Sequence, residues 1–312
     1  QGGNNTAIGR GALKTQTTGN SNVVLGDQAM QYTPASTAIT SVVAIGPSAL
    51  GDGSGMSTTG NSSVAIGNAA GNNVKNLAGE FVIIGNNAGQ KINGTGVTHI
   101  GYQAGTFATG SNNTFVGTEA GYGGATSAPF SSGVNNTAVG YQALTAFTTA
   151  EDNTALGMYA GRALTTGNSN TLLGNGAGDT MTATSNTVLI GVNAGTAINN
   201  TGASGTVAIG FKAGERHTSG GGCVYVGNAA GDHCTDGHRN VAIGEASLSG
   251  NADDDNVAVG YGALGACTGT DNVAMGTSAG DVISTGSSNT IIGKGSDPSA
   301  NDATNQTVIG FE

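Results

Sequence analysis

The sequence predicts an all-β fold, a parallel β-solenoid (or β-roll) of about eighteen short coils that runs through residues 1–312 as one continuous repeat domain. Three observations predict it. A short apolar segment that ends in Gly recurs eighteen times, at intervals of 16 to 23 residues. Gly supplies 57 of the 312 residues and aromatic residues only 4%, which excludes a wide globular core. One strand repeated at a nearly fixed period is typical of solenoids, in which each repeat forms one coil.

Each predicted strand occupies the residues just before its repeat glycine. The residue directly before Gly is aliphatic in every copy, and the third residue before Gly is always Thr or Val. Because side chains alternate along a strand, these two positions lie on one face, which we expect to fill the core. The residues between them, mostly Ala with some Leu, Phe and Tyr, form the second face. Representative aliphatic–glycine pairs are Ile8 and Gly9, Ile66 and Gly67, Ile209 and Gly210, and Ile243 and Gly244.

The repeat glycines end these strands, where a positive φ or a close backbone approach is easiest for Gly. A small residue, Ala or Ser, follows three positions later and indicates a crowded corner. Asn stands four residues before Gly in ten of the eighteen copies, as expected for a stacked amide ladder. At ~4.8 Å per coil, the coils would make a rod on the order of 80–90 Å long. The repeat glycines are Gly9, Gly26, Gly46, Gly67, Gly85, Gly101, Gly117, Gly140, Gly157, Gly174, Gly191, Gly210, Gly227, Gly244, Gly260, Gly276, Gly293 and Gly310.

Other fold classes fit the pattern less well. No segment sustains a 3.6-residue apolar period, and frequent Gly disfavours helices. A β-sandwich does not predict the same strand eighteen times. Disorder would require an aperiodic composition with few β-branched residues, whereas Val, Ile and Thr recur here at fixed positions.

Charge and hydropathy exclude two classes of partner. The net charge of −10 repels phosphate backbones, so we expect no binding to nucleic acid. No stretch approaches the ~20 apolar residues of a membrane span, so we expect no membrane insertion in this segment. The chain begins at Gln1 rather than Met, so we expect a mature or cut piece of a longer protein.

The thin core of each coil predicts association. A coil of about 17 residues encloses few side chains, and three cysteines cannot supply enough disulfide cross-links. The second, apolar strand face offers a surface to bury, and parallel chains about one axis would also hide the sheet edges. We therefore expect a homo-oligomer, whose number of chains the composition does not give.

The repeat resembles two known families. The SVAIG motif at 63–67 and the NTAVG motif at 136–140 resemble the head repeats of trimeric autotransporter adhesins, which are trimeric left-handed parallel β-rolls. The longer unit NNTAVGYQALTAFTTAEDNTALG at 135–157 is similar to phage tail-fibre repeats of the kind found upstream of endosialidase-type intramolecular chaperones. This resemblance implies an intertwined or side-by-side homotrimer. The usual period here, 16–17 residues, is longer than that of the adhesin heads.

The expected function is structural and adhesive. The resemblance implies the shaft or receptor-proximal part of an extracellular virion tail fibre, which attaches to a host cell-surface glycan or protein and joins other tail or anchor proteins. The alternative is the head of a trimeric adhesin on a bacterial cell surface, and the third candidate is a glycan-depolymerising tailspike.

Catalysis and cofactors find no support in the sequence. The four histidines have no associated nucleophile motif such as GxSxG, and acidic residues stand mostly alone in the arcs. We expect no enzyme activity and no cofactor. Ice binding would require outward rows of Thr on a flat face, whereas Thr exchanges here with Val at a position that we expect to face the core, and the insertions interrupt the lattice. The run of Asp253, Asp254 and Asp255 predicts a solvated acidic turn, with a Ca²⁺ site as the less favoured alternative.

A metal site is a speculative alternative in one region. Cys234 follows its repeat glycine by seven residues, and His217 holds the same offset one coil earlier, with His233 and His238 nearby. Imidazole and thiolate suit zinc or iron, but the spacing matches no standard zinc signature. We therefore predict no metal and expect free thiols and surface imidazoles on a variable arc.

Insertions into the repeat are where binding specificity would lie. Three longer intervals place extra residues near 27–45, 47–63 and 121–135. Exposed loop aromatics can stack on sugars or anchor protein partners. The candidate binding residues are Tyr32, Tyr122 and Phe130, against the alternative that the solenoid merely tolerates these loops.

Overall fold

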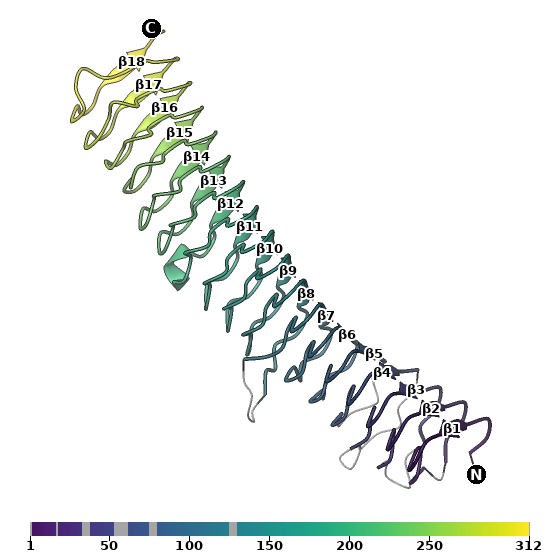
Figure 1. Cartoon of the computed structure of the whole chain (residues 1–312). Coiled ribbons are helices and arrows are strands. Elements are labelled where there is room, and N and C mark those ends of the chain that lie inside the picture. Colours follow the sequence, from purple (N-terminus) through teal and green to yellow (C-terminus); the bar gives the residue numbers. More distant parts are fainter. Residues whose placement is uncertain are drawn as a thin grey trace. The chain divides into compact units, whose positions relative to one another are not determined.

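The chain is an all-β protein that contains a parallel β-solenoid. Its contacts divide it into two compact units, Gln1–Met158 and Tyr159–Glu312. Within the described residues lie eighteen short strands and one 3-10 turn (Figure 1). The computed structural model describes residues 2–16, 18–32, 38–52, 62–74, 80–124 and 130–311.

The first unit contains nine described strands. Each strand pairs in parallel with the next one along the chain, so each repeat makes one coil. The strands are β1 (Thr6–Ile8), β2 (Val23–Leu25), β3 (Val43–Ile45), β4 (Val64–Ile66), β5 (Phe81–Ile84), β6 (Val97–Ile100), β7 (Thr114–Val116), β8 (Thr137–Val139) and β9 (Thr154–Leu156).

The second unit contains the other nine described strands, again paired in parallel and in sequence order. The 3-10 turn η1 (Thr201–Ala203) lies in the connection between its second and third strands. The strands are β10 (Thr171–Leu173), β11 (Val188–Ile190), β12 (Val207–Ile209), β13 (Val224–Val226), β14 (Val241–Ile243), β15 (Val257–Val259), β16 (Val273–Met275), β17 (Thr290–Ile292) and β18 (Thr307–Ile309).

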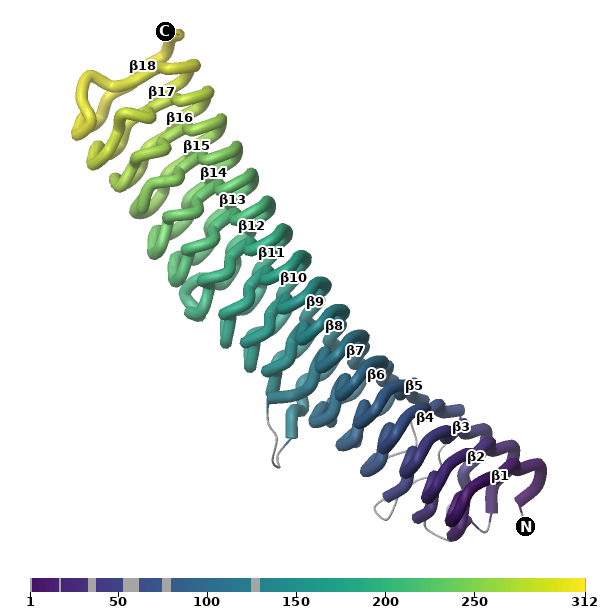
Figure 2. Tube along the Cα trace, viewed as in Figure 1, coloured from purple at the N-terminus to yellow at the C-terminus, as the bar shows by residue number. Residues whose placement is uncertain are grey.

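Equivalent residues of successive repeats lie beside one another. Val43 pairs with Val64 and Ile45 with Ile66 in the first unit. Figure 2 shows successive turns of the trace stacked on one another within each unit. This like-on-like register confirms the predicted solenoid and strand positions.

The predicted core face is wrong, because the two faces of each strand are exchanged. The middle residue of the strand, two before the repeat glycine, is buried, as at Ala65, Ala208 and Ala242. The flanking residues, among them Ile66 and Ile209, are only partly buried. The physical reason is the small interior volume of the coil, which accepts one side chain per strand. Because side chains alternate along a strand, its two neighbours must then point outward.

Side-chain sizes at two inward positions, the middle strand residue and the residue four after the repeat glycine, are matched in several coils, and in others both are small, as at Ala208 and Gly214. Where the middle strand residue is large, as at His99, Phe115 and Tyr225, the residue four after the repeat glycine is Gly. A Cβ on Gly121 would lie 2.3 Å from the Phe115 ring, and one on Gly231 would lie 2.2 Å from Tyr225. Where Leu occupies that corner, the middle residue is Ala. Examples are Leu50 with Ala44, Leu144 with Ala138 and Leu264 with Ala258, all fully buried.

The repeat glycines confirm the predicted close approach. Gly140 has φ +136°, and a Cβ there would lie 2.5 Å from the carbonyl oxygen of Gly157, the equivalent residue one coil later. Residues two positions after the repeat glycine also adopt positive φ, even where they are not Gly, as at Ala246 (φ 52°). Each coil therefore turns at several left-handed corners.

The predicted asparagine ladder is present. The Nδ2 of Asn272 donates to the Oδ1 of Asn256 at 3.1 Å, and Asn289 donates in the same way to Asn272 at 3.0 Å. A second Nδ2 bond reaches an arc carbonyl, as from Asn272 to Gly286 at 2.9 Å. These buried amides are thus satisfied by neighbouring coils, which ties each coil to the next.

Candidate functional site

The outward side of the strands is an uncharged stripe in each unit. We call it the outer sheet face, defined by the side chains three residues and one residue before each repeat glycine. No Asp, Glu, Lys or Arg occupies either position in any of the eighteen copies. Most side chains of this face are partly buried within one chain, and some are more exposed: Ile243 is 41% exposed, Met275 46% and Leu173 39%. Ordinary monomer surfaces rarely present a long apolar stripe, so this face is a candidate contact surface.

The position directly after the repeat glycine adds exposed aromatic side chains. Tyr102 and Tyr141 in the first unit, and Phe211 and Tyr261 in the second, are all at least 42% exposed. The sequence prediction missed them because other copies carry Asn, Thr or charged residues at this position. These aromatic residues follow the residues of the outer sheet face in the sequence. The residue type at their position differs from copy to copy, whereas the outer sheet face is restricted to Thr, Val and aliphatic residues.

Two of the three predicted loop aromatics come together. Both contact the ring of Phe107. The centroids of the Phe107 and Tyr122 rings lie 5.0 Å apart in an edge-on arrangement, and those of Phe107 and Phe130 lie 5.9 Å apart with the rings nearly parallel. Tyr32 is 49% exposed and is not part of this group. Phe107 was not predicted, because it lies in a regular arc and gains its partners only when the long connection between β7 and β8 returns to it.

A pocket of about 310 Å³ adjoins Phe130. Its walls come from the arcs that follow β4, β5 and β6, and from the connection before β8. The Lys91 ammonium lies 5.8 Å from the centre of the Phe130 ring. The lining residues are Asn73, Lys91, Asn93, Thr109 and Phe130. The central parts of the predicted insertions, 33–37, 53–61 and 125–129, lie outside the described residues.

The speculative metal ligands do not converge. His217 is fully buried, contrary to the expected surface imidazole, and its Nδ1 lies 3.0 Å from the carbonyl oxygen of Cys234. The Cys234 thiol donates instead to the carbonyl of Leu248 at 3.3 Å. His233 lies at the surface beside Asp232. In the part of the chain that the structure describes, no three His, Cys, Asp or Glu residues form a group that could hold a metal ion.

Protonation also disfavours metal binding at this core cluster. Burial raises the pKa of the Cys234 thiol to about 12, so the thiolate that a metal needs is suppressed. Burial likewise lowers the pKa of His217, which its two carbonyl contacts partly offset. All three cysteines are buried free thiols rather than exposed ones. The cluster fills the coil interior, next to the Tyr225 ring.

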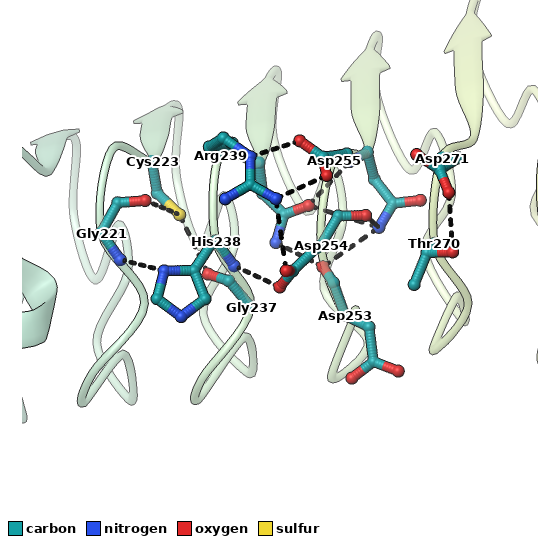
Figure 3. A network of polar contacts seen from close by, with 12 residues as sticks. Gly221, Cys223, Gly237, His238, Arg239, Asp253, Asp254, Asp255, Thr270 and Asp271 are labelled. Carbon is teal, nitrogen blue, oxygen red and sulfur yellow. Dashed lines mark hydrogen bonds and ion pairs between the residues drawn. The ribbon is translucent and has the colours of Figure 1, made fainter.

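The acidic turn forms a polar network with Arg239 (Figure 3). The Arg239 guanidinium donates two hydrogen bonds of 2.6 Å to Asp255 and lies 3.3 Å from Asp254. The hydrogen bonds from Arg239 hold the pKa of Asp255 below its usual value. His238 accepts a hydrogen bond from the backbone N–H of Gly221 at 3.0 Å. Two of the three aspartates therefore pair with an arginine one coil away, and such exposed pairs stabilise little.

Two further comparisons concern the chain as a whole. Among the described residues, no helix has the length and hydropathy that a membrane span requires. Neither models of known protein families nor curated protein sequences match the chain. The fold itself defines the class, a β-solenoid repeat protein.

Proposed function

We propose that this protein is a structural attachment protein, the shaft or receptor-proximal part of a phage tail fibre that contacts the host surface. In this role it is extracellular, part of the virion, and without catalytic activity or cofactor. Its partners are further copies of itself, other tail or surface-anchor proteins, and a host surface glycan or protein. The head of a bacterial trimeric adhesin remains the alternative, since it would use the same repeat.

The observation that supports this proposal most is the outer sheet face. Its apolar rows repeat with the spacing of the coils, about 4.8 Å, in both units. A second copy of the chain has rows of the same spacing, whereas a globular partner does not. The face carries no charge that would need a partner or water. A homo-oligomer that buries this face would add to the thin single-chain core, and the family resemblance favours three chains.

A surface-binding assay tests the attachment function. Labelled native protein is applied to a panel of bacterial cells, with and without prior removal of surface glycans by periodate or of surface proteins by protease. The proposal predicts saturable binding to some strains, lost after one of the two treatments. Absence of binding to every strain would contradict attachment by this segment, and release of glycan fragments would instead favour the tailspike alternative.

A further inference from the structure

The pocket beside Phe130 has a composition that suits one class of ligand. It combines an aromatic ring, a cation, two carboxamides and a hydroxyl from four successive coils. Only the long connection between β7 and β8 brings Phe130 back over the arc that carries Phe107. Regular coils lack this connection, so the pocket is specific to the 23-residue repeat.

The cation of the pocket has no anionic partner. In the described part of the chain, no carboxylate pairs with Lys91, and Lys14, Arg216 and Lys294 are likewise without one, whereas Arg10, Arg162, Lys212 and Arg239 form ion pairs. Its ammonium lies 5.8 Å from the centre of the Phe130 ring. An ammonium without a carboxylate partner in a pocket favours an anionic ligand. Lys91 is the one cation among the described lining residues, and one ammonium suits one carboxylate better than a phosphate, which usually draws several donors.

The remaining groups suit hydroxyl-rich ligands. The side-chain amides of Asn73 and Asn93 each offer two donors and one acceptor to a ligand. The Thr109 hydroxyl donates to the carbonyl of Ser131 at 3.0 Å, which leaves its oxygen free to accept. Phe130 adds an apolar ring surface for the C–H groups of a ligand. Amide, hydroxyl and aromatic groups in one pocket can satisfy a sugar ring on both its polar and apolar sides.

We propose that this pocket binds a carboxylate-bearing sugar, such as a uronic acid or sialic acid residue of a surface glycan. Lys91 pairs with the carboxylate, the asparagines and Thr109 bind hydroxyls, and Phe130 contacts the sugar ring. The inference rests on the proposed attachment function, since it names the class of receptor. Weak single sites of this kind suit an oligomer, because several copies bind together.

Binding of small sugars to the native assembly tests the inference. The probes for titration by NMR are glucuronic acid, N-acetylneuraminic acid, and glucuronamide as the uncharged match of glucuronic acid. We expect at least one acid to bind at millimolar concentration, and glucuronamide to bind at least fivefold more weakly than glucuronic acid if the latter is the ligand. An acidic tripeptide, Ala-Glu-Ala, tests the peptide alternative.

Variants separate the roles of the residues. Lys91→Gln should reduce the affinity for the acid about fivefold or more, and Phe130→Ala should weaken binding of charged and neutral sugars alike. The matched control is Lys212→Gln, because the Lys212 ammonium likewise lies close to an aromatic ring, 5.7 Å from that of Phe211, but outside this pocket, and pairs with Glu215. This control should not change binding.

Three results would overturn the inference: no acid binds to the folded assembly, the tripeptide binds as well as the acids, or Lys91→Gln leaves acid binding unchanged. The cell-binding assay distinguishes this failure from that of the proposed function. Attachment to cells without binding of either acid would refute the pocket alone, and acid binding without attachment would refute the function.

Discussion

At the scale of single residues, the repeat glycine is fixed by two independent constraints. It has a left-handed φ, and its missing side chain leaves space for the carbonyl oxygen of the next coil. Both constraints recur in each unit, as at Gly140 and Gly260, where a Cβ would lie 2.5 and 2.4 Å from that oxygen. The glycine was predictable from sequence because one backbone conformation, shared by seventeen of the eighteen repeat glycines, selects one residue type.

We predict that Gly260→Ala lowers the free energy of unfolding by roughly 3 kcal/mol or more, through backbone strain and overlap with Gly276. Gly262→Ala is the matched control. Gly262 has φ +62°, and a Cβ there would lie no closer than 3.7 Å to a neighbouring atom. The equivalent residue of the preceding coil is Ala246, which adopts a similar φ of 52°. The cost of Gly262→Ala should be about 1 kcal/mol. Urea unfolding measures both, and equal losses would refute the close-approach argument.

His99 is a residue-scale exception to the apolar core. Its ring is fully buried, stacks on Phe115 with centroids 5.0 Å apart, and neither ring nitrogen has a hydrogen-bond partner. Burial lowers the pKa of His99 from 6.5 to about 3, so the folded protein holds it neutral. The unfolded chain protonates it near pH 6.5, so the stabilising effect of neutrality is present above that pH and is lost as the pH falls toward 3.

We predict that His99→Phe removes this pH dependence. As the pH falls from roughly 6 to 3, the free energy of unfolding of the native protein should decrease relative to that of the variant by about 1.4 kcal/mol per pH unit. Phe should fit, because Gly105 faces His99 as Gly121 faces Phe115. Urea unfolding at pH 7, 5.5 and 4.5 measures the difference, with His233→Gln as an exposed control. The same slope in both proteins would contradict a neutral buried His99.

At the scale of the element, strand positions and register were predictable and the buried face was not. Period-two alternation assigns residues to two faces but does not say which one is inside. Two aliphatic rows suggested the core, and the small Ala row suggested a contact surface. The signal that could have decided the matter is the size match between Ala258 and Leu264, or between Tyr225 and Gly231, because only residues inside one coil need to share a fixed volume.

The size match predicts strong coupling between two positions of one coil. Ala258→Leu alone should overfill the coil, at a cost of about 1–3 kcal/mol, and Leu264→Gly alone should leave a cavity, at about 2–5 kcal/mol. The double variant reproduces the pairing of Leu172 with Gly178. It should recover about 2 kcal/mol or more relative to the sum of the single changes. Additive losses in a double-mutant cycle of unfolding free energies would contradict the shared coil interior.

The candidate sites illustrate a second limit of sequence-based prediction. Tyr122 and Phe130 could be chosen because they stand in a long insertion. Phe107 and Lys91 could not, since they occupy ordinary arc positions and are recognised only by their contacts with the Phe130 ring, which comes from a later part of the chain. The speculative metal ligands show the opposite limit: an equal offset in the repeat brings His217 near the backbone of Cys234, but the Cys234 thiol bonds to the carbonyl of Leu248 instead.

At the scale of the whole molecule, the exchange of strand faces means that the most constant residues of the repeat lie on the outer side of the strands and not in the core. The invariant Thr or Val and the aliphatic residue before Gly lie on the outer sheet face, which one chain leaves partly exposed. Their constancy over eighteen copies is explained if that face is buried between chains. The core-facing residues vary more: the middle strand residue ranges from Ala to Tyr.

Two adjacent substitutions separate the interior from the contact surface. Ala208 is fully buried and Ile209 is partly exposed on the outer sheet face. Ala208→Asp places a charge inside the coil and should prevent local folding. Ile209→Asp should leave the β-sheet circular dichroism of the chain intact but weaken association at least tenfold. Loss of folding in both variants, or unchanged association of Ile209→Asp, would contradict the assigned faces.

The mass of the native assembly tests the central claim most directly. Sedimentation equilibrium or native mass spectrometry of the purified chain should give about 90 kDa, three times the 30.1 kDa of one chain. The Ile209→Asp variant should move toward the single-chain mass. A stable species of one chain mass, folded and with its outer sheet face open to solvent, would contradict the account.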